Sequence, residues 1–222
     1  MRSGSSGIFS ICAGLLLASP SCIAPAPDAL AAQAAAQAVN RLDAAQANQF
    51  IADLGAQAIN VLQRPGQTIE QREAIFRNIL SQKFALEFIG RFVLGRHWQS
   101  FSADQREDYL ALFSEFVLSA YASNLGGYAD EKFQVLGVIE AGQQDMIVNS
   151  RITGSGREAI QVDWRVRRID AQPQIIDVAV GGISMSITQR EEFSALIQRD
   201  GVQGLLEVLR ARTLRLPAEG IQ

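Results

Sequence analysis

The sequence predicts a single α+β domain, and two observations lead to this fold class. Apolar residues recur at helical spacing from about residue 43 to residue 121, and they switch to strict alternation between residues 133 and 180. Four alternating segments joined by short links are typical of an antiparallel meander rather than of a βαβ fold. We therefore expect N-terminal helices, a twisted four-stranded antiparallel sheet and C-terminal helices in one chain of 222 residues.

Residues 1–31 have the layout of a secretory signal peptide, with the cleavage site left open. Arg2 gives a positive start, residues 8–18 form an apolar run, and Pro20 with small residues follows. The run is shorter than the roughly 20 residues that span a bilayer. Both cysteines, Cys12 and Cys22, lie in this region, so we expect a mature chain without disulfides or thiol chemistry.

Three helical regions are expected between the leader and the first strand. Residues 32–43 are rich in Ala and Gln and are expected to be a flexible segment; a helix follows over about 43–63 and ends before Pro65. Thr68 with Gln71 and Ser102 with Gln105 form capping boxes that begin the next two regions. The last of these carries one apolar stripe, which includes Tyr109, Phe113, Phe116, Val117 and Tyr121.

The clearest strand runs from Ile160 to Arg167. Period-two geometry places one set of side chains on an apolar face and a second set on the opposite face. The apolar set is Ile160, Val162, Trp164 and Val166, and the polar set is Gln161, Asp163, Arg165 and Arg167. After Gly181-Gly182, Thr188 with Glu191 suggests a third capping box, and Gly201 separates two final helices; residues 214–222 are a tail.

Composition and motifs argue against several classes of function. A net charge of −3 disfavours nucleic-acid binding. No H-E-x-x-H motif, calcium loop or paired-histidine spacing occurs, so a metal site would have to consist of carboxylates alone, and none is expected. A lipase or esterase would have to use Ser184, in an incomplete nucleophile motif, and His97, the one histidine. Eleven phenylalanines, nearly all in or beside the helices, are either plain core or the wall of a cavity for an apolar ligand.

Four segments, in order, resemble the MlaC or toluene-tolerance family of periplasmic phospholipid-binding proteins. The resemblance covers residues 44–213 and departs from the family pattern at Ala103, in place of proline, and after Phe84, where an acidic residue is missing. The matching segments are residues 92–98 (FVLGRHW), 102–106 (SADQR), 182–185 (GISM) with 190–193 (REEF), and 201–205 (GVQGL).

The resemblance implies a non-catalytic periplasmic carrier that helps to maintain outer-membrane lipid asymmetry. Its cargo would be phospholipid, without a cofactor, and its partners an outer-membrane lipoprotein complex and an inner-membrane ABC transporter with an MCE-type substrate-binding protein. A hopanoid-type polycyclic lipid is the alternative cargo. The acyl chains would lie between the sheet and the helices, where the expected lining residues are Phe88, Phe92, Tyr109, Phe113, Phe116, Val117, Tyr121, Val148, Ile160, Val162, Trp164, Val166 and Val178.

Arg165 and Arg167 are the expected docking residues. They point away from the apolar face of their strand, so they cannot line an acyl cavity. The planar guanidinium group suits bidentate pairing with carboxylates of a partner protein. The alternative is a merely solvated face, since isolated surface charges usually contribute little.

Overall fold

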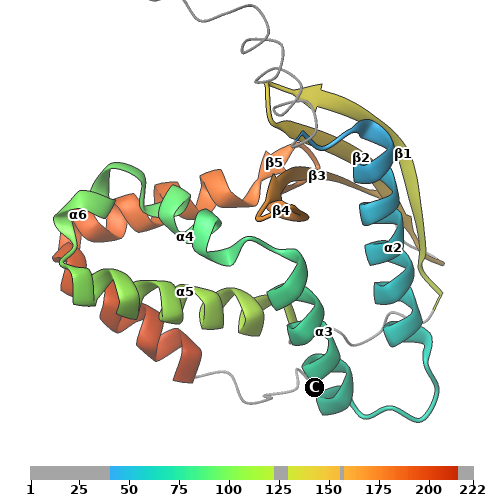
Figure 1. The fold of residues 1–222 in the computed structure, drawn as a ribbon. Helices are drawn as coiled ribbons and strands as arrows, with labels where there is room; N and C mark the ends of the chain where they lie inside the picture. The colour runs from blue at the N-terminus through green and yellow to red at the C-terminus, as the bar shows by residue number, and fades with distance from the viewer. Residues whose placement is uncertain (1–40, 123–129, 156–157, 215–222) are drawn as a thin grey trace, which may run out of the picture. The chain divides into compact units, whose positions relative to one another are not determined.

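A computed structural model describes residues 41–122, 130–155 and 158–214, which lie in one compact unit. The expected leader, residues 32–40 of the expected flexible segment and all but the first residue of the expected tail lie outside these residues. The helices are α2 (Ala44–Gln63), α3 (Ile69–Lys83), α4 (Leu86–Leu94), the 3₁₀ helix η1 (Gly95–Ser100), α5 (Ala103–Ala122) and α6 (Met185–Leu214). The strands are β1 (Lys132–Ala141), β2 (Asp145–Thr153), β3 (Ile160–Ile169), β4 (Gln172–Val180) and β5 (Ile183–Ser184) (Figure 1).

Two of the three predicted capping boxes are confirmed. Thr68 and Gln71 bond reciprocally at the start of α3, and Ser102 and Gln105 do so at the start of α5. The third is wrong, because α6 already begins at Met185 and Thr188 lies within it, donating its hydroxyl to the Ser184 carbonyl at 2.9 Å. The predicted break at Gly201 is confirmed by its φ of 72°, a conformation that favours glycine.

The predicted antiparallel meander is confirmed, with one strand more than expected. The strand order is β1-β2-β3-β4-β5, and every neighbouring pair is antiparallel. Gly181 and Gly182 have φ values of 58° and 82° and form the two-residue turn that brings Ile183 back against Val180. With two residues, β5 is too short for an alternating pattern, and this is why periodicity missed it.

Two hydrophobic clusters form the core of the described residues. The helical cluster joins α4, α5 and α6 and contains Tyr109, Phe113 and Phe193. The sheet cluster joins α2 and α3 to one face of the sheet and contains Val148 and Val166. The expectation that the α5 stripe would oppose the apolar face of β3 is therefore wrong. Tyr109, Phe113, Phe116 and Val117 pack in the helical cluster, whereas α2 covers β1 and β2 (Figure 1).

A polar clamp joins α3 to α5. Arg77 donates to both carboxylate oxygens of Glu115 at 2.7 and 2.6 Å and to the hydroxyl of Ser119 at 3.0 Å. Burial alone raises the pKa of the Glu115 carboxyl, but the hydrogen bonds from Arg77 and Ser119 and the charge of Arg77 outweigh burial. The pKa is therefore lowered from its ordinary value of 4.5.

We expect Glu115→Gln to lower the free energy of unfolding by about 1 kcal/mol at neutral pH, a value reduced for the solvent exposure of this pair. A carboxyl whose pKa is lowered by folding stabilises the protein above its unfolded-state pKa. That contribution is lost as the pH falls through the folded-state pKa. In urea unfolding series, the difference between the two proteins should therefore shrink as the pH falls below the ordinary carboxyl pKa of 4.5, and close once the pH is below the lowered pKa of the folded state. Glu107→Gln, an exposed position on α5, is the control. A difference in the free energy of unfolding that does not change with pH would contradict a stabilising role of the ionised Glu115 carboxylate.

Candidate functional site: a half-buried apolar sheet face

One face of the sheet is apolar but only partly covered. Val148 and Val166 on this face are fully buried, at 0% exposure. Toward one end of the same face, Ile160 is 45% and Val180 is 39% exposed. Between these limits lie half-buried side chains that pack against the sheet cluster, namely Phe133, Val135, Val138, Trp164 and Val178. The face is therefore sealed in its middle and accessible at one end.

The aromatic side chains of this face are held in place by specific contacts. The Trp164 indole N–H donates to the Ser150 hydroxyl at 2.8 Å, and that hydroxyl donates to the Val162 carbonyl at 2.9 Å. The rings of Phe133 and Trp164 meet edge to face, with centroids 6.3 Å apart. The indole N–H, which is the polar group of Trp164, is therefore hydrogen-bonded within the protein, and the rest of the ring contributes apolar surface to this face.

A cleft of about 710 Å³ lies between α2 and the start of β1. Phe133 connects this cleft to the apolar face, and it lies so close to Gly55 that a Cβ there would be 2.1 Å from the ring. Sequence reasoning did not name the α2 residues of this cleft, because small side chains such as Ala52, Gly55 and Ala56 carry no functional signal by themselves. A volume of this size is within the range of ligand pockets.

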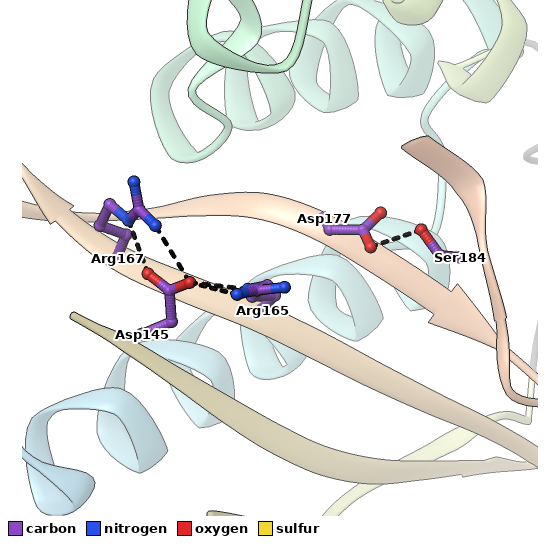
Figure 2. A network of polar contacts seen from close by, with 5 residues as sticks. All are labelled: Asp145, Arg165, Arg167, Asp177 and Ser184. Atoms are coloured by element: carbon purple, nitrogen blue, oxygen red, sulfur yellow. Dashed lines mark hydrogen bonds and ion pairs between the residues drawn. The ribbon is translucent and has the colours of Figure 1, made fainter. Parts of the chain in front are cut away.

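The opposite face of the sheet carries a buried carboxylate shared by two arginines (Figure 2). Asp145 is 2% exposed; Arg165 Nε donates to its Oδ2 at 2.7 Å and Arg167 Nε to its Oδ1 at 2.6 Å. Both arginines thus point away from the apolar face, as alternation predicts. The Arg167 guanidinium also lies 5.0 Å from the centre of the Phe88 ring. The docking role of the two arginines stays a prediction.

Ser184 takes part in a structural network rather than in a catalytic pair (Figure 2). Its hydroxyl donates to Asp177 Oδ2 at 2.6 Å and accepts the Ile187 N–H at 3.2 Å, which caps the start of α6. His97 Nε2 is instead 3.0 Å from the hydroxyl of Ser194, ten residues further along the chain. The Ser184–His97 pair that a hydrolase would need is therefore not formed.

The remaining predicted lining residues lie in different environments. Tyr109 and Phe113 are fully buried in the helical cluster; Tyr109 donates its hydroxyl to the Gly90 carbonyl at 3.0 Å, and burial raises its pKa. Phe88 and Phe92 lie on the exposed side of α4. Tyr121 is 52% exposed, yet burial, followed by the charges of nearby acidic side chains, raises its pKa. For all of these, contact with a ligand stays a prediction.

Neither a metal cluster nor a membrane-spanning helix occurs in the described parts of the chain. Within residues 41–122, 130–155 and 158–214, no group of three or more His, Cys, Asp or Glu side chains could hold a metal ion. No helix in the same ranges is long and apolar enough to cross a bilayer.

Comparisons with known proteins point to one family. The model of the MlaC protein family matches residues 52–211. The chain is 26% identical over 165 residues to the intermembrane phospholipid transport system binding protein MlaC of Haemophilus influenzae, covering 72% of this chain and 75% of that protein. Its fold is similar to that of the phospholipid-binding protein from Ralstonia solanacearum, solved in complex with a phospholipid. The TM-score is 0.65, with 19% identity, 76% of this chain covered and 97% of that one.

We expect Ser184→Ala to lower the free energy of unfolding by about 1–2 kcal/mol, because it removes a helix cap and the hydrogen bond to Asp177. Urea unfolding measures this loss, and Ser81→Ala is the control, since the Ser81 hydroxyl is exposed and donates to the Asn78 carbonyl of its own helix. We expect neither the parent protein nor either variant to hydrolyse a fatty-acyl ester. An ester hydrolysis that disappears in Ser184→Ala while stability is unchanged would contradict the structural role.

Proposed function

The chain belongs to the MlaC protein family, and we propose on that premise that it is a non-catalytic carrier of phospholipid between two membranes. Its cargo is a phospholipid, which is loaded and released at an outer-membrane lipoprotein complex and an inner-membrane ABC transporter with an MCE-type protein. The relative from Haemophilus influenzae, named as an intermembrane phospholipid transport binding protein, supports this role and a location in the periplasm.

The half-buried apolar sheet face is the observation that carries the proposal. Moving acyl chains through water costs about 0.8 kcal/mol per CH₂ group, on the order of 25 kcal/mol for two chains of about 16 carbons. A carrier must replace most of that burial. The half-buried side chains of Val135, Trp164 and Val178 supply a wall for the acyl chains on the sheet, and Ile75 and Phe76 supply apolar surface from α3.

The helical cluster supplies stability rather than lining in this proposal. Tyr109 and Phe113 are fully buried, and their rings contact each other and Phe193. A protein that opens one apolar face for a ligand needs a second core that stays closed when the ligand leaves. Phe116 and Val117 are half-buried and pack against the same cluster, and their contact with the cargo stays a prediction.

Transport of this kind requires no catalytic residue. The hydroxyl of Ser184 is engaged with Asp177 and with the start of α6, and His97 is paired with Ser194. Both residues therefore have structural partners that account for their positions. The cargo leaves unchanged, and binding has to be strong enough to carry the lipid and weak enough for release to either complex.

We expect the natively purified mature protein to contain one bound lipid per chain, identified by organic extraction and mass spectrometry. The wall formed by the sheet should retain lipid through purification, because an acyl chain in water is strongly disfavoured. Phospholipid in the extract supports the proposed cargo, and a polycyclic hopanoid in its place would contradict the assignment. An extract without stoichiometric lipid would contradict a carrier role altogether.

A matched pair of variants on the apolar face distinguishes a residue that contacts the lipid from a residue that packs in the protein core. Val178→Thr keeps the volume of a half-buried side chain but places a hydroxyl against the acyl chain. We expect about ten-fold weaker lipid binding with little change in the stability of the lipid-free protein. Val166→Thr makes the same change at a side chain that is 0% exposed, and should lower the free energy of unfolding by about 1–3 kcal/mol. Equal effects of the two variants on stability and on lipid binding would reassign Val178 to ordinary core.

A further inference from the structure

Two partly exposed aromatic rings on α4 each contact the guanidinium group of an arginine from another element. Phe88 and Phe92 lie one helical turn apart and are 36% and 37% exposed. The guanidinium carbon of Arg167, on β3, lies 5.0 Å from the centre of the Phe88 ring, and that of Arg190, on α6, lies 5.2 Å from the centre of the Phe92 ring. Three elements therefore bring two aromatic–guanidinium pairs onto one surface.

The backbone at Gly95 makes room for one of these arginines. Gly95 has a φ of 51°, and a Cβ at this position would lie 2.6 Å from Arg190 Nη2. Within the described ranges 41–122, 130–155 and 158–214, no carboxylate forms an ion pair with Arg190. Arg190 is therefore placed by the ring of Phe92 and by the space at Gly95, and no carboxylate of the described residues neutralises its charge in an ion pair.

A further arginine, Arg165, and an exposed aliphatic side chain, Ile187, lie on the elements that carry these pairs. Arg165 and Arg167 share the one carboxylate of Asp145, so this group of three side chains keeps an excess of one positive charge. Ile187, three residues before Arg190 on α6, is 50% exposed. We call this surface the arginine–aromatic patch; its residues are Phe88, Phe92, Arg165, Arg167, Ile187 and Arg190.

We propose that the arginine–aromatic patch docks the protein directly on the surface of a bilayer that contains anionic lipids. The inference rests on the proposed carrier function, for which contact with a membrane is useful. Guanidinium groups pair bidentately with phosphate oxygens. Aromatic and aliphatic side chains insert at the boundary between headgroups and acyl chains. Because the whole chain carries a net charge of −3, an anionic surface attracts this patch and repels the rest, which orients the molecule.

The mixed chemistry of the patch favours a lipid surface over a partner protein's carboxylates, the partner that the sequence suggested for Arg165 and Arg167. Carboxylate pairing would leave the exposed rings of Phe88 and Phe92 without a role. A bilayer interface accommodates the cations and the rings together, because its phosphates lie directly above its apolar layer.

The test is sedimentation of the mature protein with protein-free vesicles. We expect binding to vesicles of phosphatidylglycerol and phosphatidylcholine, little binding to vesicles of phosphatidylcholine alone, and weaker binding as salt is added. Arg190→Gln should weaken binding about five-fold, the effect expected of one arginine near an anionic surface. Phe92→Ser should weaken it several-fold by removing inserted apolar surface.

Two variants outside the patch serve as matched controls. Arg151→Gln removes an exposed arginine of β2, and Ile69→Ser removes a side chain that is 61% exposed at the start of α3. Both should bind vesicles like the parent protein. The proposal is overturned if the parent does not bind anionic vesicles, or if Arg190→Gln and Phe92→Ser bind as tightly as the controls. It is also overturned if these two variants fail only with vesicles that contain a transport complex, because the patch would then dock a protein.

Lipid analysis of the same preparations keeps this inference separate from the carrier proposal. A parent protein that holds its cargo but does not bind vesicles overturns the docking inference and leaves the carrier role in place. A parent protein without cargo that still binds anionic vesicles through the patch supports docking and overturns the carrier role.

Discussion

The architecture depends on one crossing of the chain past the edge of β4. Phe84 forms a parallel bridge to Ile175, and the Ala85 N–H donates to the Ile175 carbonyl at 2.9 Å. This crossing lies between α3, which contributes to the sheet cluster, and α4, which contributes to the helical cluster. The Phe84 ring packs against both clusters. Two cores are thereby held together at a shared side chain, and each can be optimised for a different task.

The division into two cores reconciles stability with an accessible apolar surface. A face that binds lipid cannot be filled by the protein's own side chains, so it contributes less to folding than a closed core of the same composition. The helical cluster, with its contacts among Tyr109, Phe113 and Phe193, is closed. The sheet cluster combines sealed positions such as Val166 with half-buried ones such as Val178. A gradation of this kind on one face is consistent with a removable ligand.

One face of the sheet is apolar and the opposite face is charged. Along β3, alternate residues supply the apolar face, and the residues between them supply the cations that Asp145 orders on the other side. A buried carboxylate that held one arginine would leave the other mobile. Sharing Asp145 fixes both guanidinium groups, and Arg167 then reaches the ring of Phe88 on α4. The order of the charged face thus comes from one strand register, Asp145 opposite Arg167.

The α+β class, the antiparallel meander, two capping boxes and the faces of residues 160–167 of β3 could be predicted from the sequence. Helix period, strand alternation and caps are local properties of the chain. Which apolar faces pack against each other could not be predicted from these local properties, because it depends on segments that are far apart in the chain. The α5 stripe is apolar in either environment, so its pattern could not tell whether it faces the sheet or α4 and α6. The same holds for Ser184, whose partner Asp177 comes from a neighbouring strand, and for the α2 cleft, which small side chains form only when β1 packs beside them. Partner choice is a property of surfaces brought together by folding, and periodicity does not encode it.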